Sequence, residues 1–174
     1  MLDAARAQAP ICTDMLQKMA QFGMFTAEFY LGLGEPRTAI SLPETVSRGL
    51  MGQCYLNAGQ LAMCTPTLAY CEGYACRTGL PFPVHHAWCL DGDGQVLDVT
   101  WPYEPSNEYL GVALSPACLL NSLEETGLWG VLSEMLPPSL VKMHPTRYLD
   151  ERWLPEETRM DAFWQRLRGV LQLP

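Results

Sequence analysis

The sequence has few charged residues and no concentration of basic ones. Charged side chains make up 17% of the 174 residues, and the formal net charge is −8. Because a nucleic-acid backbone or an anionic membrane surface attracts clustered Lys and Arg, we expect neither as a partner. Long apolar runs are also missing, since no stretch approaches the roughly 20 residues that a transmembrane helix needs. The chain is therefore expected to bind neither nucleic acid nor membrane.

The N-terminal residues lack the pattern of a secretory signal peptide, in which a basic segment is followed by an apolar one. The chain has seven cysteines, and this odd number argues against a framework of disulfides. Free thiols persist in a reducing compartment, so we expect a cytoplasmic protein. Most of these cysteines are expected to act as small buried apolar side chains.

Several functional motifs are absent as well. The sequence contains no G-x-S-x-G elbow for a serine nucleophile, no G-x-G-x-x-G and no phosphate-binding P-loop, so no organic cofactor is implied. Cysteines and histidines are dense over residues 64–89, but no C-x-x-C or H-x-x-x-H pair occurs, and we therefore expect no metal. Residues 91–94 resemble the start of a calcium loop, yet Pro102 stands where such a loop needs Glu, which leaves a hairpin turn.

Hydrophobic residues make up 48% of the sequence, enough for a sizeable core, and no linker divides residues 1–174, so we expect a single domain. The spacing of apolar residues predicts the following helices and strands. Helices are expected over 14–22, from Cys54 onward, over 117–136 with interruptions, and from 155 onward. Strands are expected over 67–75, 86–91 and 96–101. Residues 31–50 are expected to form a long surface segment. The fold class is therefore α+β.

Cys54 lies at the start of a predicted helix, directly after Gly52 and Gln53. A thiol at a helix N-terminus is close to the positive end of the helix dipole, which favours the thiolate. Unpaired backbone N–H groups at this end can stabilise an oxyanion, and Gly52 permits the close approach of a substrate. The alternative interpretation of Cys54 is a buried structural cysteine.

Two predicted strands carry a histidine and an aspartate. If Leu90 pairs with Val96 across the turn, His86 and Asp98 are diagonal neighbours on one face of the sheet, close enough for a hydrogen bond. A register slip of one residue would place them on opposite faces. His85 is the competing histidine, and it would project to the other face.

The order Cys54, His86, Asp98 is that of a nucleophile, its base and an orienting carboxylate, and we expect the three to converge in one cleft. With their flanks, His86-Ala87-Trp88 and Asp98-Val99-Thr100-Trp101, they resemble the transglutaminase-like branch of the papain-like cysteine-enzyme superfamily. The resemblance covers about residues 50–112, and it departs from the family at Val99, where Pro is frequent. It implies a papain-like core in which the Cys helix packs against an antiparallel β-sheet, with additional helices at both ends.

The resemblance also implies roles. Cys54 would be the nucleophile, His86 the general base and acid, and Asp98 the residue that orients the imidazole. The oxyanion donor is open, because Arg48 stands where papain-like enzymes have Gln. The backbone N–H of Cys54 is the favoured donor. The further candidates for oxyanion or substrate binding are Gln53, Tyr55 and Trp88.

The chemistry implied is acyl transfer through a thioester. With water as acceptor, the protein is a hydrolase, which could be a protease, an amidase or a deamidase, and its substrate is a protein, a peptide or a small amide. Transfer to an amine, as in a transglutaminase, is one alternative, and a catalytically inactive member that binds a protein is another. Hydrolysis is preferred because water is always available and the sequence identifies no acidic pocket for an amine. The oligomeric state is left open.

Overall fold

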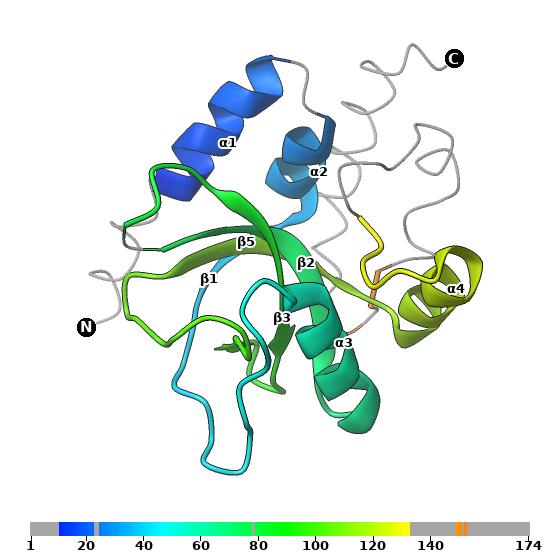
Figure 1. Cartoon of the computed structure of the whole chain (residues 1–174). Helices are drawn as coiled ribbons and strands as arrows, with labels where there is room; N and C mark the ends of the chain where they lie inside the picture. The colour runs from blue at the N-terminus through cyan, green and yellow to red at the C-terminus, as the bar shows by residue number, and fades with distance from the viewer. Residues whose placement is uncertain (1–10, 23–24, 78, 133–148, 151, 153–174) are drawn as a thin grey trace.

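The computed structural model describes residues 11–22, 25–77, 79–132, 149–150 and 152 (Figure 1). Its elements are α1 (Ile11–Gln21), α2 (Phe25–Leu33), β1 (Glu35–Thr38), α3 (Cys54–Cys64), β2 (Ala69–Cys76), β3 (Val84–Leu90), β4 (Val96–Leu97), β5 (Glu108–Leu114) and α4 (Pro116–Thr126). The predicted fold class, α+β, is confirmed. Within the described part of the chain, no helix has the length and apolar character needed to cross a membrane.

Five strands form one antiparallel sheet in the order β1-β5-β2-β3-β4. The central strand β2 pairs along its whole length, with β5 on one side and β3 on the other. β5 follows β4 in the sequence but lies between β1 and β2, so the chain crosses from one edge of the sheet to the far side of β2. The edge strands β1 and β4 have only four and two residues. Such short edges offer little backbone for pairing with another chain.

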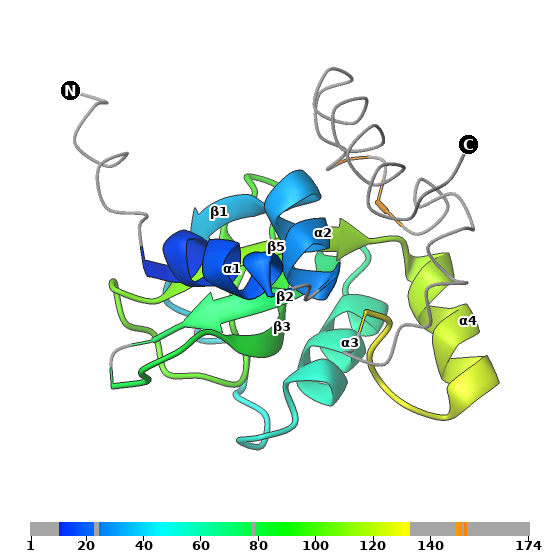
Figure 2. The same ribbon diagram turned by 90° about the horizontal axis from the view of Figure 1, so that it is seen from above.

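Side chains from the two faces of the sheet enter separate hydrophobic clusters. Because successive side chains of a strand point to opposite faces, β3 contributes Ala87 and Cys89 to one cluster and Trp88 and Leu90 to the other. The first cluster contains side chains from all four described helices, and we call the face of the sheet that borders this cluster the helix side. In Figure 1, α1 and α2 are drawn towards the top of the view and α3 and α4 towards its lower right, and Figure 2 shows these elements from above.

Two expectations that concern the hairpin and the Cys helix are confirmed. α3 begins at Cys54, and Leu90 pairs with Val96 across the turn. Other expectations need correction. The last predicted helix before Pro137 ends at Thr126, because Gly127 adopts a left-handed conformation (φ 68°) that closes the helix. The surface segment expected over 31–50 contains the end of α2 and the strand β1. The helix expected from residue 155 onward lies outside the described residues.

A pair of glycines allows the aromatic packing beside β3. Gly73 of β2 pairs with Gly111 of β5, and a Cβ on Gly73 would lie only 2.4 Å from the Cα of Gly111. A Cβ on Gly111 would lie 2.6 Å from the ring of Trp88. Since no real side chain tolerates such distances, the absence of Cβ atoms here lets the indole of Trp88 lie against the backbone of β5.

Glu72 is a fully buried carboxylate in the middle of β2. It accepts hydrogen bonds from the hydroxyl of Tyr70 (2.8 Å) and from the backbone N–H groups of Val131 (2.5 Å) and Leu132 (2.6 Å). Burial raises the pKa of Glu72, and these three hydrogen bonds oppose the rise. The carboxylate thus ties the segment after α4 to the centre of the sheet. That segment packs on α3, where a Cβ on Gly59 would meet the ring of Trp129 at 2.5 Å.

We expect Glu72→Ala to destabilise the fold strongly, because two backbone N–H groups and one hydroxyl would lose their acceptor. A buried polar group left without a partner costs about 1–3 kcal/mol, so the free energy of unfolding should fall by at least about 3 kcal/mol. Urea denaturation measures this change. The matched control is Glu44→Ala, since Glu44 is exposed, and it should change the free energy of unfolding by less than about 0.5 kcal/mol. Equal effects of the two substitutions would contradict the anchoring role of Glu72.

Candidate active site

Cys54 is the first residue of α3 and is 9% exposed. The backbone N–H groups of the first turn of a helix have no acceptor within the helix, so they can bind an anion. The preceding residue, Gln53, is exposed and makes no side-chain capping bond to this turn. The loop turns at Gly52, whose φ of +83° is readily adopted only by glycine. An exposed loop therefore leads directly to the thiol and to the start of the helix.

This loop is tied to the chain that follows β4. The side chain of Asn57 donates through Nδ2 to the carbonyl of Leu50 (2.8 Å) and to the hydroxyl of Thr100 (2.9 Å). The N–H of Gly49 donates to the carbonyl of Val99 (2.8 Å). Two segments that are far apart in the sequence are thus held side by side, one with the candidate nucleophile and the other with the candidate carboxylate.

Asp98 is 4% exposed, and its carboxylate accepts four hydrogen bonds. Oδ2 accepts from Nε2 of His86 and from the hydroxyl of Tyr109, each at 2.8 Å. Oδ1 accepts from the N–H groups of Thr100 (2.8 Å) and Trp101 (2.9 Å). Burial alone would raise the pKa of Asp98, but the bonds from His86 and the two N–H groups, with the charge of His86, hold this pKa below its usual range. The carboxylate is therefore ionised at neutral pH.

The strand expected over 96–101 is wrong beyond Leu97, where β4 ends. The N–H groups of the two residues that follow Val99 donate to the carboxylate of Asp98 instead of to a neighbouring strand. Such local bonds from the backbone to an aspartate turn the chain. Asp98 itself follows directly after the paired residues, so the relation to His86 that the register predicted is still formed.

His86 is 2% exposed and lies between the other two residues. Its Nε2 bonds to Asp98, and the thiol of Cys54 lies close enough to the imidazole to raise its pKa. Burial alone would lower the pKa of His86, but the hydrogen bonds and negative charges of Asp98 and Cys54 outweigh this effect and raise the pKa to about 9. The structure thus brings Cys54, His86 and Asp98 together with a charged imidazole at neutral pH. Their catalytic roles remain predictions.

Trp101 covers the imidazole of His86. The two rings are stacked, with centroids 4.1 Å apart and an angle of 21° between their planes. The guanidinium of Arg77 lies 5.6 Å from the centre of the Trp101 ring, and Arg48 donates to the carbonyl of Trp101. Arg48, which stands where the resembled family has Gln, is therefore hydrogen-bonded to the chain that holds the carboxylate.

Trp88 and Tyr55 lie at different depths in the fold. Trp88 is 1% exposed in the hydrophobic cluster opposite the helix side, with its ring centroid 6.3 Å from that of His86. Trp88 thus packs in the core near the imidazole, and a role for it in binding a substrate stays a prediction. Tyr55 is half-buried, and its hydroxyl bonds to Nδ1 of His85.

His85 points to the helix side of the sheet, away from the carboxylate, as the alternation along β3 predicts. Its Nε2 bonds to the hydroxyl of Tyr30 (3.0 Å), and its Nδ1 bonds to that of Tyr55. The ring of Tyr74 packs edge-on against it, with centroids 5.1 Å apart. Burial and the charge of His86 lower the pKa of His85 to about 4. His85 is therefore a neutral residue outside the group of three, which agrees with the preference for His86.

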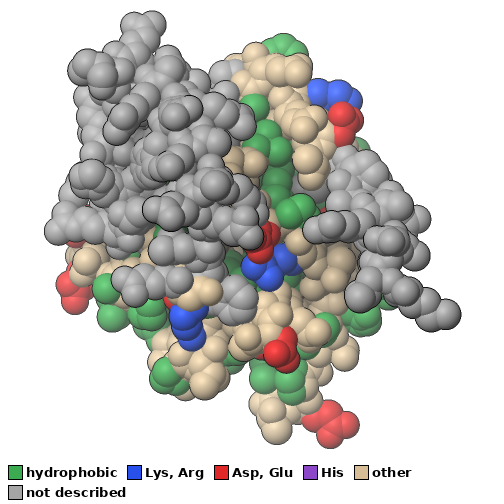
Figure 3. All heavy atoms as spheres, turned by 180° about the vertical axis from the view of Figure 1, so that it is seen from behind, with side chains coloured by type: hydrophobic (Ala, Val, Ile, Leu, Met, Phe, Trp, Pro, Cys, Tyr) green, Lys and Arg blue, Asp and Glu red, His purple; other side chains and the backbone are tan. Residues whose placement is uncertain are grey.

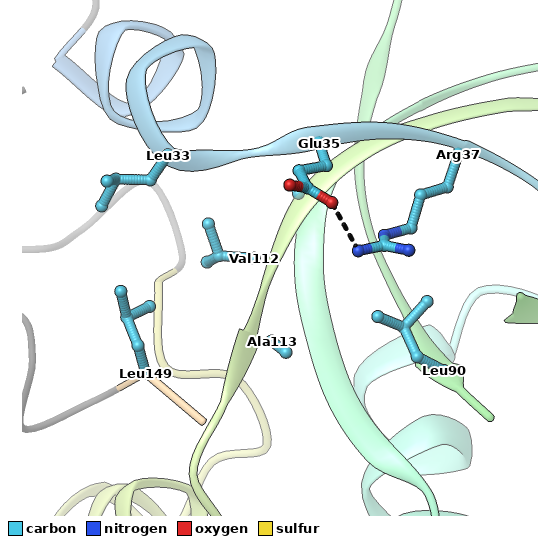
Figure 4. Close-up of a pocket in the computed structure, with 8 residues that line it drawn as sticks. Leu33, Glu35, Arg37, Leu90, Val112, Ala113 and Leu149 are labelled. Carbon is cyan, nitrogen blue, oxygen red and sulfur yellow. Dashed lines mark hydrogen bonds and ion pairs between the residues drawn. The ribbon is translucent and has the colours of Figure 1, made fainter. Parts of the chain in front are cut away.

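A small cavity lies elsewhere, beside β1 and β5 (Figure 4). Its volume of about 10 Å³ holds roughly one water molecule. Figure 4 shows the ion pair between Glu35 and Arg37 at its rim, with an N–O distance of 2.7 Å. Its lining includes Leu33, Leu90 and Leu149, but none of the three candidate catalytic residues. The cavity is too small for a substrate.

The described residues contain no group of three or more His, Cys, Asp or Glu side chains that could hold a metal ion. The six described cysteines are free thiols. On the face shown in Figure 3, the described Lys and Arg side chains form small separate groups close to Asp and Glu, so this face carries no continuous basic patch.

Sequence reasoning missed the residues that hold the carboxylate and the imidazole in place. Tyr109 lies on β5, a strand that was not expected, although Glu108–Leu114 is a short, almost continuous apolar run of the kind that forms a buried strand. Trp101 was expected in a strand, and its stacking on His86 follows from the turn at Asp98. Tyr30 lies on α2, which also was not expected.

Comparison of the chain with protein-family models, with curated proteins and with solved structures found no match.

We expect the two adjacent histidines to titrate far apart in NMR spectra of their ring nitrogens. His86 should carry a proton at pH 7 and lose it near pH 9, whereas His85 should be neutral down to about pH 4. Asp98→Asn should lower the pKa of His86 by about one to three pH units, because the opposite charge is removed. His85→Gln and His86→Gln assign the signals. A wild-type midpoint for His86 near its ordinary value would contradict the geometry.

The same shift predicts the pH dependence of stability. Because the pKa of His86 is about 9 in the folded state and about 6.5 in the unfolded chain, protonation favours folding. Its contribution to the free energy of unfolding is complete below the unfolded value and is lost as the pH rises through the folded value. Urea denaturation across this window should therefore show a larger loss for wild type than for His86→Gln.

Proposed function

We propose that the chain is a cysteine-dependent hydrolase of amide bonds, with Cys54 as nucleophile, His86 as general base and acid, and Asp98 as the residue that orients the imidazole. The observation that carries this proposal is the arrangement of His86. Its Nε2 is bonded to a buried ionised carboxylate at 2.8 Å, and the imidazole lies beside the thiol of Cys54, the first residue of a helix. A charged imidazole beside a thiol stabilises the thiolate, which is the reactive form.

In the proposed reaction, the sulfur of Cys54 attacks the carbonyl carbon of the amide. The new C–S bond moves an electron pair to the carbonyl oxygen, and the backbone N–H of Cys54 donates to this oxyanion. When the C–N bond breaks, the proton of His86 goes to the leaving amine, and a thioester remains. His86 then takes a proton from water, the hydroxide oxygen attacks the thioester carbon, and the C–S bond breaks to regenerate the thiolate and release the acid.

The proposal includes a papain-like core and membership of the transglutaminase-like branch of that superfamily. The order Cys, His, Asp, the start of α3 at the cysteine and the packing of α3 on β2 and β3 support them. Within this branch, an amine can replace water as the acceptor of the acyl group. Hydrolysis is the simpler reaction because it needs no second binding site. A protein, peptide or small amide is the class of substrate that this chemistry takes, and the cytoplasm is the compartment that suits its free thiols.

The second candidate function is protein binding without catalysis. It is favoured by the low exposure of the site, since Cys54, His86 and Asp98 are 9%, 2% and 4% exposed and do not line the described cavity. A binding protein could keep the fold and the buried charge pair while the thiol stays out of reach of substrates. The reactivity of Cys54 separates the two candidates.

We expect iodoacetamide to alkylate Cys54 far faster than an ordinary thiol at pH 7, because a charged imidazole beside a thiol favours its reactive form. Peptide mass spectrometry after limited labelling measures the rate at each cysteine. Cys64 is the matched control, since it is exposed and is the last residue of the same helix. A Cys54 rate no faster than that of Cys64 would contradict the hydrolase and favour the binding protein.

Substitutions extend this test to turnover of a fluorogenic peptide amide library. Cys54→Ala should abolish activity, because no neighbour can form the thioester, and should lower the melting temperature only slightly, since it removes a single buried sulfur atom. Asp98→Asn should lower the rate by a factor on the order of 10²–10⁴, since the imidazole loses its orienting partner. Cys64→Ala should have full activity. Full activity in Cys54→Ala would rule out the proposed nucleophile.

A further inference from the structure

We propose that the bond between Tyr55 and His85 positions Cys54 against His86, so that Tyr55 and His85 are positioning residues for the thiol–imidazole pair. This inference rests on the proposed function, because the alignment matters only if Cys54 and His86 react as a pair. It concerns two residues that take no part in the reaction scheme above.

The argument begins with adjacency along the chain. Tyr55 follows Cys54 at the start of α3, and His85 precedes His86 on β3. Two neighbouring residues of the helix thus contact two neighbouring residues of the strand, Cys54 with His86 and Tyr55 with His85. A rotation or shift of the first helical turn would disturb the two contacts together.

The first turn of α3 needs such a support. Its backbone N–H groups have no acceptors within the helix, and Gln53 makes no side-chain capping bond. Asn57 ties the loop before the helix to Leu50 and Thr100, but it lies one turn beyond the thiol. The Tyr55 hydroxyl is the group that fixes the residue next to Cys54 directly to β3.

His85 is a rigid and neutral partner for this bond. Tyr30 of α2 holds the other ring nitrogen at 3.0 Å, and Tyr74 packs edge-on against the ring. A neutral imidazole donates from one nitrogen and accepts at the other, so the two hydroxyls satisfy it completely. Burial and the charge of His86 lower the pKa of His85 to about 4, which keeps a second positive charge away from the thiol–imidazole pair.

The experiment is the pH profile of Cys54 alkylation by iodoacetamide, measured with the full-length protein. In wild type, the rate of Cys54 should exceed that of Cys64 at pH 7 and should change in a step near pH 9, where His86 loses its proton. Tyr55→Phe removes one hydroxyl and keeps the ring. It should lower the rate of Cys54 at pH 7 towards that of Cys64 and weaken the step, because the thiol is no longer held beside the imidazolium.

The matched control is Tyr30→Phe, which removes the other hydroxyl bonded to His85. Tyr30 belongs to α2, so its bond connects β3 to α2 and not to the Cys helix. Tyr30→Phe should lower the melting temperature and keep the wild-type pH profile. His85→Phe, which retains an aromatic ring, should reproduce the effect of Tyr55→Phe. The double variant should then be no slower than either single variant, because the two side chains act through one bond.

The outcomes separate the two proposals. A rate and pH profile that are unchanged in Tyr55→Phe and in His85→Phe overturn the positioning role and leave the hydrolase intact. Equal changes in Tyr55→Phe and Tyr30→Phe also overturn it, because they would show a general loss of packing. The absence of the step near pH 9 in wild type overturns the pairing of Cys54 with His86, and with it both proposals. If Tyr55→Phe does not fold, His85→Phe decides the question through the same profile.

Discussion

The site depends on the buried hydrogen bond between His86 and Asp98. An ionised carboxylate inside a protein is tolerated only when donors satisfy it, and removal of one partner leaves an uncompensated charge. Asp98 meets this requirement with donors from β3, from β5 and from its own turn. The carboxylate of Asp98 therefore does three things. Its bonds to the backbone end β4 and place Trp101 over the imidazole, and its bond to Tyr109 connects β4 to β5.

Two adjacent histidines show how strongly the face of a strand determines chemistry. His86 faces a carboxylate and a thiol, and its pKa rises to about 9; His85 faces tyrosine hydroxyls on the helix side, and its pKa falls to about 4. Burial acts on each imidazole in the same direction. The difference comes from the charges of their partners, so a register slip of one residue would exchange the two environments.

The crossover to β5 links the fold to the site. Because β5 lies between β1 and β2, Tyr109 reaches the carboxylate of Asp98, and Gly111 leaves room for the ring of Trp88. On the opposite face, Glu72 holds the segment after α4 on the sheet, and this segment packs on α3. The helix that carries Cys54 thus contacts β3 at its start. At Gly59 it packs against the segment that the carboxylate of Glu72 holds on the sheet.

The sequence by itself determined the local features: a helix that begins at Cys54, a hairpin with Leu90 opposite Val96, and the parity that puts His86 and Asp98 on one face. These features follow from turn residues and from the two-residue period of a strand, which are visible in a short window. Only the tertiary structure decided the order of the strands, the end of β4 and the partners of the two histidines. The hydroxyl groups of Tyr109, Tyr30 and Tyr55 come from segments far apart in the chain, and no local pattern shows which of them will meet a histidine or its carboxylate. The burial of Trp88 was likewise decided by packing, because alternation along β3 gives the direction of a side chain but not what covers it.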